Sequence, residues 1–471
     1  MSRRAWCRRA MLCTTLACVT FAAAEDSLQQ KLDRQFQSAV AQYNSGQFAE
    51  AATQLERLLP HVPNNFEVQE LLGMVYASMS QDAKAVVHLE AAVRLKPDSA
   101  AARTNLAASL SRSGKSELAG EQLRKALALK PHDYTANHNL GEFYIKLGKI
   151  AEARPLLERA QRIDPSSYDN GYDLAMADLL TGQLAEARQL VQELLKKKDT
   201  GELHNLLGQI EEKDGKFVAA ANEFAAAAHA DPSEENLFDW GSELLLHRTY
   251  EPAIEVFRAA ARRYPTSPRL SIGLGMALYA RGLYEDAVKA LLTAADLNPS
   301  DPRCYLFLSK AYDSSPSQAD EVIQRFKRYA GLEPNNALAQ YYYAMSLWKG
   351  KRSEGDSLDL QEVESLLKKS IALNGSIPEA HMQLGNLYVG RHQFEQSVPE
   401  YVRALELNPN LPEAHYRLGT DYVHLGQKDR AQAEFAIYQK LRAQHMAEVD
   451  KERAEVQQFI YSSKSAPSAK P

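Results

Sequence analysis

Cysteine is scarce in this sequence of 471 residues. There are four cysteines, of which Cys7, Cys13 and Cys18 lie at the N-terminus, so Cys304 stands alone in the remainder of the chain. A single thiol cannot form an internal disulfide, and stability must therefore come from packing. We predict that Cys304 is a small buried residue, with a reactive or pairing thiol as the alternative.

An excess of positive charge is also missing. Lys and Arg total 55, whereas Asp and Glu total 60, which gives a formal net charge of −5. Nucleic acid carries a dense array of phosphates and demands a basic face on any protein that binds it. The charge balance therefore argues against nucleic acid as a partner.

The sequence also lacks long apolar runs after Ala24 and the common catalytic motifs. After Ala24 no apolar run approaches the roughly 20 residues that a membrane-spanning helix needs. The sequence contains no HExxH, CxxC, GxSxG or P-loop pattern, each of which marks a common kind of catalytic or metal site. We therefore expect no enzymatic activity, no cofactor and no resident metal.

The N-terminal segment has the order of a secretory signal. Four arginines come first, an apolar run follows from Met11 to Ala24, and three alanines precede Glu25. We predict a signal peptide over residues 1–24, with cleavage after Ala24 and export to the periplasm or outer membrane, or secretion. An uncleaved anchor, a twin-arginine signal and a lipoprotein box ending at Cys18 are the alternatives. Cleavage would leave 51 basic and 60 acidic residues.

Several residue types recur with a period of about 34 residues, which indicates an internal repeat. Prolines recur at Pro63, Pro97, Pro131, Pro165, Pro232, Pro265, Pro299, Pro334 and Pro409. Leucine followed by a small residue recurs at Leu72–Gly73, Leu106–Ala107, Leu140–Gly141, Leu207–Gly208, Leu274–Gly275, Leu384–Gly385 and Leu418–Gly419. A glycine near the middle of the unit recurs at Gly46, Gly114, Gly148, Gly182, Gly215, Gly282 and Gly426.

These spacings predict two helices in each unit. Apolar residues three and four apart fall on one face of a helix. The central glycine interrupts that pattern, because glycine tolerates the backbone of a helix end. Small residues on the facing stripes allow the two helices to approach closely, and the late proline ends the second helix. Each pair leaves an apolar face that must stack on its neighbour.

This unit resembles the tetratricopeptide repeat (TPR). The resemblance implies an all-α fold, a right-handed superhelical solenoid of about twelve helix-turn-helix repeats. We expect a lead-in at 25–31, repeats one to five at 32–199, and repeats six to twelve at 200–440 with an inserted polar loop near 349–361. A capping helix at 441–461 and a disordered tail at 462–471 would follow. The repeat that lacks its final proline, near 196–202, is a candidate joint between the two arrays.

In the TPR family the first helix of each repeat lines the concave side, so the residue before each Leu–small pair should face the groove. The partner-binding candidates are these residues and two neighbouring aromatics: Asn105, Asn139, Asp173, Asp239, Phe307, Tyr341, Tyr342, Trp348, Gln383 and Arg417.

Two groups of candidates suggest specific chemistry. Asn105 and Asn139 match the asparagines with which some TPR proteins hold a peptide backbone, although unspecialised polar lining is the alternative. Phe307 and Tyr342, with Tyr341 and Trp348 nearby, would form an exposed aromatic anchor for a partner, unless these rings pack between helices. His381 and His415 fill equivalent places, where packing is favoured over metal binding.

The sequence therefore predicts a non-enzymatic adaptor, exported to the cell envelope, that binds a protein or peptide of unknown identity in its groove. Peripheral association with the envelope is compatible with this prediction. The first alternative is a periplasmic scaffold of a polysaccharide or protein secretion machine. The second alternative is an enzyme or cofactor carrier.

Overall fold

The computed structural model describes residues 30–315, 318–350 and 360–444. Every regular element in these ranges is a helix, and the prediction of an all-α helical-repeat solenoid is confirmed. The predicted signal peptide, the predicted tail at 462–471 and most of the inserted loop lie outside the described residues. None of the described helices is both long enough and apolar enough to span a membrane.

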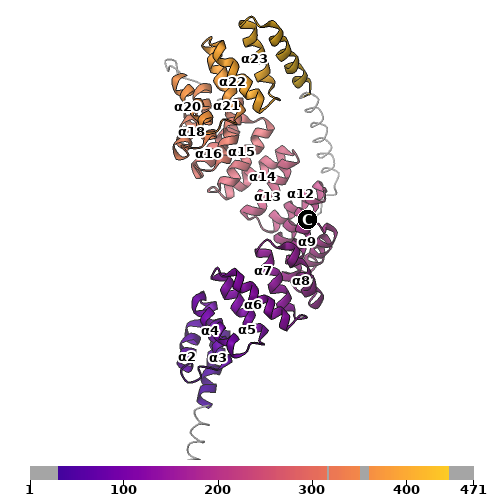
Figure 1. The fold of residues 1–471 in the computed structure, drawn as a ribbon. Coiled ribbons are helices and arrows are strands. Elements are labelled where there is room, and N and C mark those ends of the chain that lie inside the picture. Colours follow the sequence, from indigo (N-terminus) through magenta and orange to yellow (C-terminus); the bar gives the residue numbers. More distant parts are fainter. Residues whose placement is uncertain (1–29, 316–317, 351–359, 445–471) are drawn as a thin grey trace, which may run out of the picture. The chain divides into compact units, whose positions relative to one another are not determined.

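The helices follow one another as antiparallel pairs, and within each of the chain's two compact units the pairs pack on their neighbours (Figure 1). Residues 30–44 pair with α2 (Phe48–Leu58). The first helices of the following repeats are α3 (Phe66–Ser78), α5 (Ala100–Arg112), α7 (Tyr134–Lys146), α9 (Tyr168–Thr181), α11 (Gly201–Lys213), α13 (Glu234–Leu246), α15 (Pro268–Arg281), α17 (Pro302–Ser314), α19 (Ala337–Lys349), α21 (Pro378–Gly390) and α23 (Pro412–His424).

The second helices complete these pairs. They are α4 (Asp82–Leu95), α6 (Ser116–Leu129), α8 (Ile150–Ile163), α10 (Leu184–Leu195), α12 (Phe217–Ala230), α14 (Tyr250–Arg263), α16 (Tyr284–Leu297), α18 (Ala319–Leu332), α20 (Leu360–Leu373) and α22 (Phe394–Leu407). The last pair ends with a continuous helix at 428–444. Residues 441–444 therefore continue the last repeat, and the rest of the predicted capping helix lies outside the described residues.

The chain divides into two compact units between Lys197 and Lys198. Unit 1 contains the helices up to α10, and unit 2 contains α11 and those that follow. The predicted joint near 196–202 spans this division.

Side-chain caps define where most first helices begin. The cap residue accepts a hydrogen bond from a backbone N–H of the first turn, which has no partner inside the helix. These caps are Asn65, Ser99, Asp133, Ser167, Thr200, Ser233, Ser267, Asp301 and Asn336. In α21 and α23 a proline at the first position replaces the side-chain cap, since proline has no N–H to satisfy.

The turn inside each repeat needs a left-handed residue. All seven glycines of the central series have φ between 71° and 88°. In four other repeats Ser80, Arg248, Gln318 and His392 occupy this turn with φ of 54° to 59°. A residue with a Cβ adopts that conformation at a cost of about 1 kcal/mol, so these four turns carry backbone strain.

The Leu–Gly pair allows close contact between the two helices of a repeat. A Cβ atom added to Gly141 would lie 2.7 Å from the Leu157 side chain, and one added to Gly385 would lie 2.8 Å from the Tyr401 ring. Real Cβ atoms essentially never show contacts this short. The small residue therefore accepts the large side chain of the second helix, as the sequence predicts.

His381 and His415 tie their repeats together. The ring nitrogens of His381 lie 2.6 Å from Glu400 Oε2 and 3.3 Å from the Gly375 carbonyl oxygen. Those of His415 lie 2.5 Å from Glu434 Oε2 and 3.0 Å from the carbonyl oxygen of Pro409. Each imidazole thus links a first helix to its second helix and to the preceding turn, which supports the packing interpretation.

Cys304 is fully buried in α17. Its Sγ donates to the Asp301 carbonyl oxygen over 3.1 Å. Burial raises the pKa of the thiol to about 12, so the reactive thiolate is strongly disfavoured. This environment supports the prediction of a small buried residue.

Candidate functional site

The predicted groove positions differ in their exposure. Six are half-buried: Asn105, Asn139, Asp173, Asp239, Phe307 and Gln383. Arg417 is exposed, and it lies 3.4 Å from Glu413 on the same helix. Gln383 accepts a hydrogen bond of 3.0 Å from Asn386, whose own oxygen accepts one from the Tyr401 hydroxyl. Arg417 and Gln383 are thus held by residues of their own repeats.

In unit 1 the lining is more polar than in unit 2. A cavity of about 320 Å³ against α5, α6 and α7 is lined by the polar residues Thr104, Ser111, Arg112, Asn139, Glu142 and Lys146, and by the apolar residues Ala107, Ala108, Leu123 and Phe143. We call this set the polar groove. Asn139 is therefore placed in a cavity, while Asn105, one repeat earlier on α5, is half-buried. Lys146 and Glu142 form an ion pair of 2.6 Å.

Asp173 on α9 is the most perturbed acid of this region. Burial raises its pKa to about 6, and the neighbouring carboxylates Glu142 and Asp169 add to the shift. The positive charges of His138 and Lys146 oppose the shift without cancelling it. A carboxyl group in this setting carries its charge at a cost to the fold.

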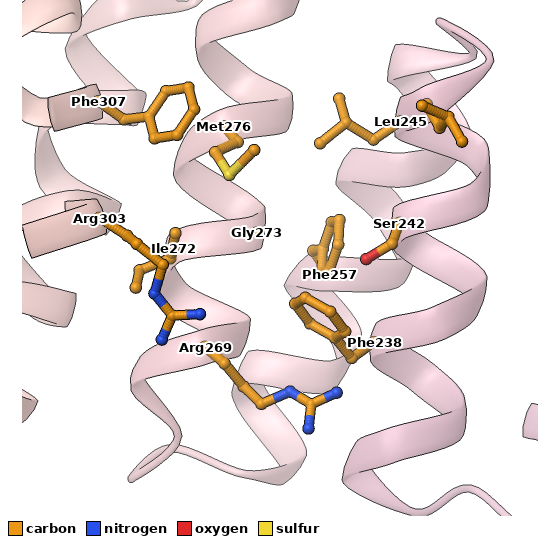
Figure 2. Close-up of a pocket in the computed structure, with 11 residues that line it drawn as sticks. Phe238, Ser242, Leu245, Phe257, Arg269, Ile272, Gly273, Met276, Arg303 and Phe307 are labelled. Carbon is orange, nitrogen blue, oxygen red and sulfur yellow. The ribbon is translucent and has the colours of Figure 1, made fainter. Parts of the chain in front are cut away.

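In unit 2 the lining is apolar. A cavity of about 380 Å³ lies against α13, α15 and α17. Its walls include Phe238, Leu245, Leu246, Ile272, Met276 and Phe307, and Ser242, Arg269 and Arg303 are its polar residues (Figure 2). We call this cavity the apolar hollow. Of the predicted site residues, Phe307 lines it.

Gly273 allows the Phe257 ring to approach α15 closely beside the hollow. It holds the groove position of its repeat, where other repeats carry side chains such as Asn139 or Asp239. The Phe257 ring fills the space behind it, since a Cβ atom added to Gly273 would lie 2.4 Å from that ring. A Cβ atom added to Gly241 would lie 2.8 Å from the same ring. Phe257 thus forms the floor between α13 and α15.

Two arginines border the hollow. Arg269 and Arg303 are the second residues of α15 and α17, at the positive ends of the helix dipoles. The Arg269 guanidinium stacks over Phe238 at 4.1 Å and lies 3.8 Å from a carboxylate oxygen of Glu234. Arg303 donates through Nε and Nη2 to Asp301, yet its side chain remains 68% exposed.

Asp239 belongs to a polar network beside the hollow. It accepts a hydrogen bond of 2.8 Å from Asn205 of α11. The same amide group of Asn205 donates to Asn236 over 3.1 Å, and Asn205 accepts from Gln209. Asp239 therefore links two successive first helices, and its carboxylate is partly engaged.

The predicted aromatic anchor is wrong for Tyr342. This side chain is only 7% exposed, and its ring lies 5.8 Å from that of Phe326. Burial raises the pKa of the Tyr342 hydroxyl to about 12. Tyr341 and Trp348 are half-buried and pack on neighbouring core clusters. These rings are covered because α19 stacks on its neighbouring helices. The sequence pattern does not predict this stacking.

The sequence analysis missed most of the hollow. The candidates did not include Phe238, Met276, Arg269 and Arg303. The candidate list was built mainly from the single position before each Leu–small pair. Two signals were present. A glycine interrupts the groove series at Gly273, and arginines occupy the same position in two successive repeats.

The fold and the groove together define a helical-repeat scaffold for protein interactions. Family profiles described as tetratricopeptide repeat match residues 36–100, 111–168, 146–210 and 238–302, and one described as TPR repeat matches 385–426. The chain belongs to the tetratricopeptide-repeat family. Members of this family bind proteins or peptides and are typically non-enzymatic.

Some solved structures are similar to this chain at low sequence identity. The Cut9–Hcn1 hetero-tetramer of the APC/C is 15% identical, with 86% of each chain covered and a TM-score of 0.37. A tetratricopeptide repeat protein from Parabacteroides merdae ATCC 43184 is 16% identical over 53% of this chain and 99% of that chain, with a TM-score of 0.41.

Pseudomonas aeruginosa pilF is 21% identical over 44% of this chain and 94% of that chain, with a TM-score of 0.37. No curated protein sequence matches this chain.

Proposed function

We propose that this protein is a non-enzymatic scaffold that binds an extended segment of a partner protein in the groove of unit 2. The observation that carries the proposal is the apolar hollow, an open cavity whose walls are mainly aromatic and aliphatic side chains. An open apolar cavity of this size suits a bulky side chain of a partner, since burial of its surface stabilises the complex.

The charge pattern defines the partner further. Arg269 and Arg303 place two guanidinium groups beside the hollow, and Asp301 engages only one edge of Arg303. An arginine fork binds a carboxylate through two parallel N–H donors. We therefore expect the bound segment to carry a bulky apolar residue next to an acidic residue or a C-terminal carboxylate.

A peptide-display selection on the purified full chain tests this function. We expect selected peptides to share an apolar residue beside an acid. Their affinity should fall when the apolar residue becomes alanine, or when the acid becomes its amide. Phe307→Ala and Arg269→Gln should weaken binding, whereas Asn139→Ala in the polar groove should not. Selected peptides that lack this pattern, or that bind all variants equally, would contradict the proposal.

Export to the cell envelope is the second part of the proposal. It rests on the arginine-rich and apolar order of residues 1–24, and the periplasm or the outer membrane would be the destination. N-terminal sequencing of the protein isolated from its native cells provides the test. A mature chain that begins at Glu25 supports export, whereas a chain that begins at Met1 in the cytoplasmic fraction contradicts it.

A further inference from the structure

Three titratable side chains meet at the C-terminal ends of α11 and α13, outside the apolar hollow. Glu243 lies in the last turn of α13, and His247 is the C-cap residue of this helix, four residues later, so that the two side chains lie on the same side. Glu212 is the second-last residue of α11. One carboxylate oxygen from each glutamate and one ring nitrogen of the histidine all lie within 4.8 Å of one another.

Glu243 is the unusual member of this cluster. Its side chain is only 4% exposed, and its Oε1 has no hydrogen-bond donor among the described residues. A buried carboxylate oxygen without a donor is costly and requires an explanation. Burial, and next the charge of Glu212, raise the pKa of Glu243 to about 7. A bound cation would stabilise the charged carboxylate at this place.

The geometry suits a small cation with a nitrogen ligand. His247 Nε2 lies 3.4 Å from Glu243 Oε1, close to the separation of about 3.4 Å between two ligands that each lie about 2.1 Å from a tetrahedral metal. The His247 ring is held by stacking on Phe217, with centroids 4.0 Å apart. Glu212 is half-buried, so its flexible side chain can close the remaining distance.

We propose that Glu212, Glu243 and His247 bind a divalent transition-metal ion. An imidazole nitrogen with two carboxylate oxygens favours Zn²⁺ or a neighbouring first-row ion over Mg²⁺ and Ca²⁺, which prefer oxygen ligands alone. Burial also lowers the pKa of His247, which favours the neutral ring that binds metals. Three protein ligands leave one position for water. This site is independent of the proposed peptide groove.

Zinc binding to the full chain tests this site. Cys7, Cys13 and Cys18 are first replaced by serine in every sample, so that N-terminal thiols cannot bind the metal. The protein is stripped with a chelator and dialysed against Zn²⁺, and bound zinc is measured by elemental analysis. We expect one zinc ion per chain and a higher melting temperature with zinc, with no comparable effect of Mg²⁺.

Matched variants distinguish this site from background binding. Glu243→Gln and His247→Gln should each weaken zinc binding about tenfold or more and remove the thermal shift. His204→Gln is the control, because the His204 ring also contacts two carboxylates, Glu223 and Asp199, with both nitrogens engaged.

Circular dichroism on each variant before metal is added shows that its fold is retained, and having two ligand variants covers the case in which one does not fold. Unchanged zinc binding in both ligand variants, or equal loss in His204→Gln, would overturn the proposal. If the parent protein fails to retain zinc, the proposal is overturned as well. The buried Glu243 carboxyl group would then be stabilised by a bound proton instead of a metal ion.

Discussion

The polar groove of unit 1 and the apolar hollow of unit 2 are built on the same repeat, yet they present opposite chemistries. Asn139 and Glu142 line the first, while Phe307 and Met276 line the second. Both regions retain the small residue that accepts a large side chain of the second helix, as at Gly141 and Gly275. The recurring small residues and apolar spacings of the repeat therefore specify the fold. The groove positions vary between repeats and can determine which partner binds.

The largest loss of stability is expected at the small residues that both units use to pack their paired helices. Gly141→Leu in unit 1 and Gly275→Leu in unit 2 should each lower the free energy of unfolding by about 3 kcal/mol, because the new side chain overlaps Leu157 or Leu291. Chemical denaturation monitored by circular dichroism provides the measurement. Gly331→Ala is the control, since no atom lies near its added Cβ. If either leucine variant is as stable as the parent, the two units do not share this packing.

The second prediction distinguishes the polar groove from the apolar hollow by their effects on peptide affinity. Phe307→Ala should reduce affinity for a selected peptide by about 30-fold, which corresponds to about 2 kcal/mol, because a wall of the hollow is lost. Asn139→Ala should leave that affinity unchanged. Fluorescence anisotropy with a labelled peptide measures both. A larger loss in the Asn139 variant would move the binding site to unit 1.

The third effect concerns pH and arises in unit 1. The pKa of Asp173 is about 6 in the fold, above the value of about 3.9 in an unfolded chain. The folded state therefore binds this proton more tightly, and the contribution of Asp173 to stability is lost as the pH rises from about 4 through about 6.

Asp173→Asn should thus raise the free energy of unfolding by about 1 kcal/mol at pH 7.5, with little gain at pH 4. Denaturation at both pH values provides the measurement, and Asp98→Asn at an exposed position is the control. An equal gain at both pH values would show that the charge of Asp173 is not the cause.

The smallest effect tests the strained turns. Ser80→Gly should stabilise unit 1 by about 0.5 kcal/mol, because the strain of a left-handed serine exceeds the greater chain entropy of an unfolded glycine. His392→Gly is the corresponding change in unit 2, where φ is 58°. Thermal unfolding measures both, and Gly114→Ser should have the opposite sign. Loss of stability in both glycine variants would show that the side chains contribute more than the strain costs.

The helices could be predicted from the sequence with considerable accuracy. The first helices from α3 onward begin at Phe66, Ala100, Tyr134 and the later residues that the 34-residue spacing indicates. The predicted turn glycines have positive φ. Both features depend on residues close in sequence: capping groups, apolar spacing and glycine conformations. Short-range interactions of this kind depend on the order of nearby residues, so they can be predicted from the sequence.

The candidate site could be predicted only in part. Phe307, one of the predicted site residues, lines the apolar hollow, but Tyr342 is buried. Arg269 and Arg303 were not among the candidates. Exposure at a given repeat position depends on how neighbouring helices cover it, and this varies from repeat to repeat. The same position is half-buried at Asn139 and buried at Tyr342.

The sequence by itself determined the repeat, its two helices and the small residues between them, because these follow from periodic contacts within one unit. Tertiary structure alone decided that apolar side chains enclose a hollow, because its walls come from three stacked helices. It likewise brought Glu212 to Glu243 and His247 across two repeats. Contacts between repeats depend on the shape of each stacked surface, and no spacing within a single repeat encodes that shape.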